Sequence, residues 1–200
     1  MKISSKYGSN NSKYCYPNTN ILINKLDIKD EKLLEKADSL YSAQRLLELQ
    51  AEPISGNFNL EYLKEIHYYI FQDLYKFAGK IREEDITKGN THFAKSQYIV
   101  PNAIKLFNEL NNEDFLLETS IDIEHFSKKT AHYMAELNVL HPFRDGNGRA
   151  IREFIRCLSL KCGYILNWNS VNKNKIFNAS IKSVFNIEPL SKCIKEALEL

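Results

Sequence analysis

The 200-residue chain is poor in cysteine, and its cysteines are not spaced to share a metal. The four of them, Cys15, Cys157, Cys162 and Cys193, include no CxxC pair. This scatter argues against zinc and disulfide scaffolds. Cys157 and Cys162 lie in or beside an apolar helical stretch, where a buried reduced thiol is expected. We therefore expect a protein of a reducing compartment, the cytoplasm.

Long apolar runs and a charge excess are also missing. No run approaches the roughly 18 apolar residues that a membrane span needs, and the first 15 residues have no apolar core of signal-peptide length. The 27 Lys and Arg nearly cancel the 25 Asp and Glu, for a net charge of +2. We therefore expect neither a membrane protein nor a globally basic nucleic-acid binder.

What is present is typical of one folded domain. Hydrophobic residues are 44% and charged residues 26% of the chain, near globular averages. Apolar residues recur every three or four positions, which predicts helices. The predicted helices cover residues 30–50, 60–77, 100–110, 120–137, 149–161, 171–185 and 189–198. Residues 1–20 lack this period, so we expect an irregular lead-in at 1–20 and a single all-α domain at 21–200.

One short segment has a different pattern. Thr87-Lys88-Gly89-Asn90-Thr91 is rich in turn formers and lies between Ile81–Ile86 and His92–Ala94. Gly89-Asn90 accepts the positive φ angles of a tight turn. The sequence therefore predicts a small β-hairpin here.

The segment Leu140–Arg149, LHPFRDGNGR, carries the chemistry. Its Pro, Gly and Asn content predicts a loop that leads into a helix N-terminus. Gly146 and Gly148 bracket Asn147, which lets successive backbone N–H groups turn inward around an anion. The helix start adds further donors. We therefore predict a phosphate site.

Three arginines on the following helix support this prediction. Arg149, Arg152 and Arg156 share one helical side. A cation near a helix N-terminus opposes the helix dipole by roughly 0.3–1 kcal/mol. Because a polyphosphate would offset this through charge-assisted hydrogen bonds, the arginines indicate a nucleotide.

Two further side chains complete a reaction. Asp145 beside a phosphate site is suited to Mg²⁺, which binds one or two carboxylates plus phosphate oxygens. His141 is suited to a general base that takes a hydroxyl proton. The set predicts transfer of a phosphate-containing group from a nucleotide to a hydroxyl.

Structural explanations remain open for each residue. His141 could be a structural hydrogen-bonding residue, Asp145-Gly146 only a turn, and the arginines a solvated helix face. A P-loop does not fit because GK[ST] is missing, and Ile151 takes the third glycine position of a dinucleotide motif. His67 lies on an apolar helix face and is expected to be a satisfied core histidine.

Residues 141–152, HPFRDGNGRAIR, resemble the Fic motif HPFx[DE]GNGRxxR at every specified position. The resemblance to small toxin-type Fic proteins extends over roughly Tyr14–Phe185. It implies a Fic fold, a compact helical bundle with a small β-hairpin flap over the active site. It also implies transfer of AMP from Mg-ATP to a Ser, Thr or Tyr hydroxyl of a target protein, with release of pyrophosphate.

The resemblance also implies residue roles. His141 would be the base and Asp145 the Mg²⁺ ligand, and Arg152 would hold the γ-phosphate. The remaining phosphate contacts would come from Gly146, Asn147, Gly148 and Arg149. The flap would border the nucleotide and register an extended target segment by strand addition. Its expected contact residues are Lys88, Gly89, Thr91, Phe93 and Ala94.

Regulation and target are also implied. Many Fic proteins carry an inhibitory [ST]xxxE[GN] helix. Here Ser120–Glu124 matches its first five positions, but His125 follows and the segment is predicted to lie inside a core helix. We therefore expect a separate antitoxin whose Glu inserts near Arg152. By resemblance, the target would be a type II DNA topoisomerase.

Two alternatives to AMP transfer stay open. A Doc-like kinase would place the nucleotide in reverse, but Doc-like motifs carry a lysine in the second-glycine region, where this chain has the intact Gly146–Gly148 pair. A non-enzymatic nucleotide-binding module need not keep His141, Asp145 and both arginines.

Overall fold

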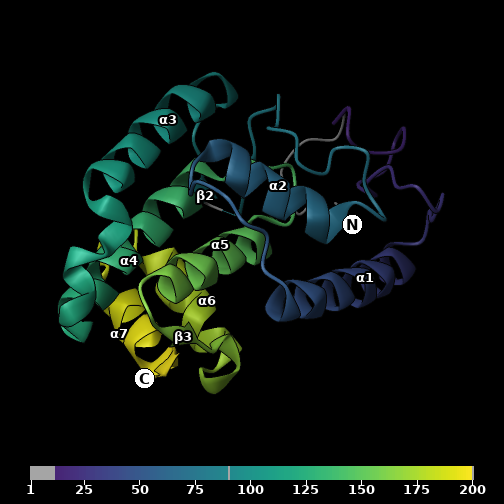
Figure 1. Cartoon of the computed structure of the whole chain (residues 1–200). Helices are drawn as coiled ribbons and strands as arrows, with labels where there is room; N and C mark the ends of the chain where they lie inside the picture. Colours follow the sequence, from purple (N-terminus) through teal and green to yellow (C-terminus); the bar gives the residue numbers. More distant parts are fainter. Residues whose placement is uncertain (1–11, 90, 200) are drawn as a thin grey trace.

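The computed structural model describes residues 12–89 and 91–199, and it is mostly helical (Figure 1). Its helices are α1 (Glu31–Ala51), α2 (Leu60–Phe71), α3 (Ser96–Asn112), α4 (Ile123–Leu140), α5 (Asn147–Lys161), α6 (Lys173–Lys182) and α7 (Glu188–Ala197). Three 3₁₀ turns cover Asp114–Leu116, Glu118–Ile121 and Trp168–Ser170. Two antiparallel pairs complete it: β1 (Thr87–Lys88) with β2 (Thr91–His92), and β3 (Ile165–Leu166) with β4 (Leu198–Glu199). The all-α prediction is confirmed.

The central helix is α5, and it carries the arginines. Its apolar side chains Ile151, Phe154, Ile155 and Leu158 are fully buried. α2 and α4 pack against it, and α7 packs against α4 and α6 (Figure 1). Burying a side chain of this size contributes about 1.5–3 kcal/mol. The core therefore fixes the orientation of α5, and with it the position of the residues predicted to bind phosphate.

Helix α2 begins where predicted and ends earlier. The Asn59 side chain accepts the backbone N–H of Tyr62, as an N-cap should. The prediction continued the helix to Phe77, but α2 ends at Phe71. Leu74 and Phe77 are still buried, so turns preserve the apolar spacing without a helix. The prediction was wrong because burial, not helical geometry, produced that spacing.

The predicted hairpin is confirmed by its strand pairing, with Thr87 opposite His92 and Lys88 opposite Thr91, while Asn90 of the predicted turn lies outside the described residues. Gly89 has a φ of +58°, which its lack of a Cβ permits at low cost. The β3–β4 pair was not predicted. Strands of two residues are too short to show an alternating pattern.

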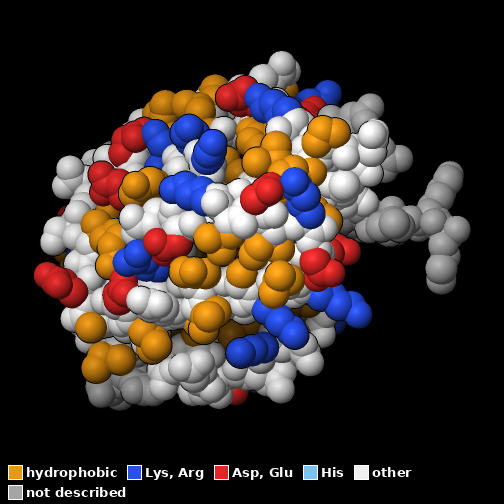
Figure 2. All heavy atoms as spheres, turned by 90° about the vertical axis from the view of Figure 1, so that its right-hand side faces the viewer, with side chains coloured by type: hydrophobic (Ala, Val, Ile, Leu, Met, Phe, Trp, Pro, Cys, Tyr) orange, Lys and Arg blue, Asp and Glu red, His pale blue; other side chains and the backbone are white. Residues whose placement is uncertain are grey.

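Residues 1–11 of the predicted lead-in lie outside the described residues. In the rest of the lead-in, Cys15 is buried, and its backbone forms an isolated antiparallel β-bridge with Leu22. None of the described helices combines the length and the apolar character that a membrane crossing requires. Figure 2 shows lysine, arginine and acidic side chains interspersed on one face, as the small net charge predicts.

Candidate active site

The loop between α4 and α5 is set by two residues with positive φ. His141 ends α4 with φ 44° and ψ 60°, and Gly146 precedes α5 with φ 79°. A side chain other than glycine rarely adopts such angles, and positions that hold one are often functional. The backbone N–H groups of Asn147 and Gly148 follow and have no acceptor among the described residues. They are the open donors of the α5 N-terminus.

Buried hydrogen bonds within the loop fix its conformation. The Asn147 side chain accepts the Phe143 N–H and donates to the Phe143 carbonyl, both at 2.8 Å. The Phe143 ring is fully buried and stacks on His67, with centroids 3.8 Å apart. The Asn147 side chain is therefore committed to the loop. Of the predicted phosphate contacts at this residue, the backbone N–H remains.

His67 is the second support. Its Nδ1 accepts the Gly79 N–H at 2.9 Å, and its Nε2 lies 2.9 Å from the Asp145 carbonyl. Since a carbonyl only accepts, Nε2 carries the proton and the ring is neutral. Burial, above all, lowers the pKa of His67 to about 3. The prediction of a satisfied core histidine is confirmed.

This neutral His67 predicts a pH-dependent stability. Its pKa is about 3 when folded and about 6.5 when unfolded. Between these values the unfolded chain binds the extra proton, so stability falls as pH falls from 6.5, by up to about 1.4 kcal/mol per pH unit. Urea unfolding at pH 7 and pH 5 measures this loss. In the His67→Gln variant, which cannot titrate, the loss should be smaller; an equal loss in both proteins would contradict the assignment.

The His141 ring has a defined orientation. Its Nδ1 lies 3.3 Å from the Asn138 carbonyl, so Nδ1 carries the proton and Nε2 has the lone pair. The ring stacks on Phe93 of the flap, with centroids 3.7 Å apart. Burial, with the charges of Arg82 and Lys88 adding to it, lowers the pKa of His141 to about 3. The imidazole is therefore neutral at pH 7, with a lone pair on Nε2.

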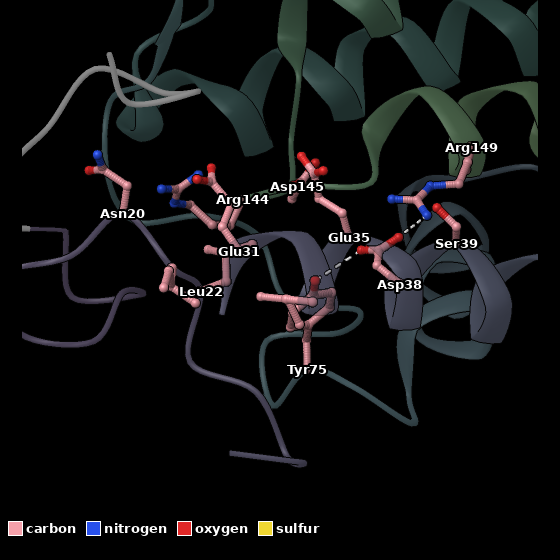
Figure 3. A pocket seen from close by; sticks show the side chains of 12 residues that line it. Asn20, Leu22, Glu31, Glu35, Asp38, Ser39, Tyr75, Arg144, Asp145 and Arg149 are labelled. Carbon is pink, nitrogen blue, oxygen red and sulfur yellow. Dashed lines mark hydrogen bonds and ion pairs between the residues drawn. The ribbon is translucent and has the colours of Figure 1, made fainter. Parts of the chain in front are cut away.

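The three arginines have different environments. Arg149 pairs with Asp38 of α1, donates to Ser42 Oγ at 2.7 Å and lies over the Phe71 ring. Figure 3 shows Arg149 pointing at Asp38, which also accepts the Tyr75 hydroxyl at 2.9 Å. Asp38 thus holds Arg149 from outside the motif.

Arg152 differs from its neighbours on α5. No carboxylate among residues 12–89 and 91–199 pairs with it, and burial and the nearby Arg149 charge lower its pKa. Arg156 instead pairs with Glu153 at 2.7 Å and donates to the Leu49 carbonyl at 2.9 Å. The sequence grouped Arg156 with the phosphate cations, but these contacts make it part of the α5–α1 packing.

A cavity of about 710 Å³ lies over the α5 N-terminus. Its floor includes His141, Asp145, Gly146–Arg149 and Arg152. The flap contributes Lys88, Gly89, Thr91, His92 and Phe93. Helix α6 and the residues after it add Ser180 and the apolar side chains of Phe177, Ile181, Val184 and Phe185. Ala94, predicted as a flap contact, does not line the cavity; it lies at the base of the flap, where its N–H donates to the Val139 carbonyl at 3.0 Å.

The Asp145 carboxylate lies at the cavity, where it was predicted to bind Mg²⁺. Its Oδ1 accepts the Gly146 N–H at 2.7 Å, and its side chain borders the cavity floor. The described residues hold no cluster of three or more His, Cys, Asp or Glu side chains suited to a metal. A protein-only metal cage is therefore absent there. One carboxylate with phosphate oxygens is a donor set that suits Mg²⁺.

Sequence reasoning missed three contributors to this site. The apolar wall on α6 has helical spacing, which is typical of a core face, yet Phe177 and Phe185 are 53% and 94% exposed. Asp38 lies on α1, more than 100 residues before its partner Arg149. Arg82, which contacts the His141 carbonyl, is a cation in a region that we had considered only for its hairpin.

The fold and the site together define a class: an all-α protein with a polyphosphate-sized cavity at a helix N-terminus, a neutral histidine and a hairpin flap. A family model described as Fic/DOC family matches residues 57–158. The chain belongs to this family.

Individual relatives and solved structures agree with this family assignment. The chain is 40% identical to protein adenylyltransferase VbhT of Bartonella schoenbuchensis over 96% of this chain, but it spans 40% of the length of that relative. It is 35% identical to "Probable protein adenylyltransferase Fic" of Escherichia coli, covering 86% of this chain and 84% of that protein. BepC of Bartonella tribocorum with bound AMPPNP is 25% identical and matches with a TM-score of 0.83, covering 93% of this chain and 96% of that one. A Bep effector Fic domain of Bartonella quintana with bound ADP is 26% identical, with a TM-score of 0.84, covering 93% and 94%.

Proposed function

We propose that this protein is a protein adenylyltransferase, which transfers AMP from ATP to a Ser, Thr or Tyr hydroxyl of a target protein. The observation that carries the proposal is the neutral His141, with its lone pair on Nε2, in the same cavity as the open donors of the α5 N-terminus and Arg152. A base and a phosphate site this close are what the transfer of a nucleotide to a hydroxyl requires. The names of VbhT and the Escherichia coli Fic relative support it.

The cavity has two chemically different ends, which orient a nucleotide. The N–H groups of Asn147 and Gly148, with Arg149 and Arg152, suit the phosphates. The apolar α6 wall, with Phe177 and Phe185, suits a nucleobase, since aromatic side chains stack on its faces. The bound ADP and AMPPNP in the two solved relatives support this use of the cavity.

In the reaction, the target hydroxyl oxygen attacks the α-phosphorus of ATP. The bond between the α-phosphorus and the oxygen bridging to the β-phosphate breaks, and pyrophosphate leaves with the bond electrons. His141 Nε2 takes the hydroxyl proton, while the Asn138 carbonyl holds the ring through Nδ1. The positive groups of the α5 N-terminus offset the negative charge that develops on the phosphates.

Asp145 would hold Mg²⁺. A bound Mg²⁺ would neutralise phosphate charge and orient the triphosphate. The carboxylate is pre-positioned for this because the Gly146 N–H fixes its Oδ1 and His67 fixes its carbonyl.

The test of the function uses ATP labelled on the α- or the γ-phosphate, the purified chain, and the soluble proteins of a bacterial extract as pooled acceptors. We expect protein labelling from the α position. Label from the γ position would indicate the Doc-like kinase reaction. Label from neither position would indicate a nucleotide-binding module, and either result would overturn the proposal.

Two of the three arginines of α5, Arg152 and Arg156, give a matched pair of variants. Arg152→Gln should weaken ATP binding about 10- to 100-fold, because a hydrogen bond to a charged group contributes about 1.5–3 kcal/mol. Arg156→Gln should leave ATP affinity within about threefold, since Glu153 and Leu49 already occupy that side chain. Isothermal titration with ATP measures both. Equal losses in the two variants would contradict the division of roles between them.

Arg152 is also the basis for the proposed regulation. A groove of about 830 Å³, bordered by Leu46, Gln50, Arg152 and Lys173, is open beside the active site. We propose that it receives a Glu-bearing helix of a small antitoxin, and the lack of an ion pair between Arg152 and any described carboxylate supports such a partner. The Ser120–Glu124 segment does not serve, since Ser120 lies in a 3₁₀ turn before α4 and Glu124 pairs with Lys195.

The proposed target comes from the resemblance, and the proposed compartment comes from the cysteines. Purified type II DNA topoisomerase is the first acceptor to test with α-labelled ATP. The four cysteines are all free thiols, which fits action in the reducing cytoplasm.

A further inference from the structure

A buried arginine outside the motif connects the flap to the histidine. Arg82 is 1% exposed, and it precedes β1 by five positions. Its guanidinium donates to backbone carbonyls rather than to acids: His141 at 2.8 Å, Leu140 at 3.3 Å, Glu84 at 2.7 Å and Ala94. No carboxylate of the described residues forms an ion pair with it.

These acceptors belong to three segments that the reaction must keep in register. Leu140 and His141 end α4, where helix carbonyls lack intrahelical partners. Glu84 lies before the flap, and Ala94 comes just after it. Two backbone hydrogen bonds join the same segments. The Arg82 N–H donates to the Pro142 carbonyl at 2.9 Å, and the Ala94 N–H donates to the Val139 carbonyl at 3.0 Å. Arg82 is therefore the junction between the flap and the α4 end.

A buried charge that forms no ion pair with a carboxylate of the described residues is costly, and Arg82 does not line the cavity. Its pKa is lowered by burial, as expected for a cation in such a place. The guanidinium has five donors in a rigid planar fork, which suits several carbonyls at fixed angles. The positive charge also complements the negative C-terminal end of α4. Only arginine combines this planar set of five donors with a positive charge.

We infer that Arg82 is a positioning residue, which locks the flap and His141 into one unit so that a hydroxyl presented by the flap meets Nε2. The inference rests on the proposed adenylyl transfer. The stack of Phe93 on His141, with centroids 3.7 Å apart, depends on this lock, because Phe93 lies next to Ala94. A misplacement of about 1 Å can lower a rate 100-fold.

The test compares Arg82→Gln and Arg82→Lys with Leu190→Ala. Leu190 is fully buried in α7 and borders neither the active-site cavity nor the groove beside it, so L190A reports the effect of lost stability alone. With α-labelled ATP and extract proteins, R82Q should lower kcat at least about 30-fold. ATP affinity should stay within about threefold, because Arg82 touches no phosphate-site residue side chain. R82K, which keeps the charge and three donors, should recover part of kcat.

A second measurement does not depend on activity. Hydrogen exchange of the Phe93, Ala94 and His141 amides should be faster in R82Q than in L190A, at temperatures chosen for equal distance below each melting point. If the wild-type chain transfers no α-label, the proposed function fails, and this exchange measurement alone decides on Arg82. Unchanged exchange, a kcat loss no larger than that of L190A, or a parallel loss of ATP affinity would each overturn the inference.

Discussion

Replacing His141 with alanine should reduce AMP transfer by about 100- to 10,000-fold, the usual effect of removing a general base. ATP affinity should change little, because the proposed phosphate donors lie at the α5 N-terminus and on Arg152. The measurement is the initial rate of α-label transfer at saturating ATP, together with ATP binding by titration.

The His141 variant needs a control for the flap, since Phe93 stacks on the imidazole. Phe93→Leu removes the ring contact and keeps the base, so its rate should fall less than that of H141A. If H141A retained near wild-type transfer, another group would be the base. If it lost ATP binding in proportion to rate, His141 would be a binding residue.

The second large effect is on folding. Gly146→Ala would place a Cβ 2.3 Å from the Phe71 ring, at a φ of +79°. The left-handed angle costs about 1–2 kcal/mol, and the overlap adds about 1–3 kcal/mol. We expect unfolding free energy to fall by about 2–5 kcal/mol, measured by urea denaturation.

Gly163→Ala is the matched control. Gly163 also has a positive φ, +85°, but an added Cβ would have no heavy atom within 4 Å. Only the backbone cost of about 1–2 kcal/mol should remain. Equal destabilisation in the two variants would show that the Phe71 contact is not limiting.

The sequence predicted the parts of this molecule that are local. Apolar spacing located the helices, and Gly89-Asn90 located the hairpin turn, because turn geometry and helix periodicity depend on neighbouring residues. The motif loop was predicted for the same reason. His67 was identified as a core residue from its helix face alone.

What sequence could not predict depends on contacts across the chain. The three arginines of α5 look equivalent by spacing, but their surroundings differ. Arg149 pairs with Asp38 and Arg156 with Glu153, whereas Arg152 is partly buried and forms no ion pair with any described carboxylate. Asn147 was expected to contact a phosphate, but its side-chain amide is hydrogen-bonded to the Phe143 backbone instead. The α6 wall could not be told from a core face, because periodicity reports an apolar side and not what covers it.

The tie between Asp38 and Arg149 bears on how small an active fragment can be. The region that the family model matches begins at residue 57, after α1 has ended at Ala51. A polypeptide trimmed to that start would lose the carboxylate and the Ser42 hydroxyl that aim this arginine, while keeping every letter of the motif. Truncation at residue 57 should therefore yield a weak nucleotide binder, and the working catalytic unit begins before the conventional domain border.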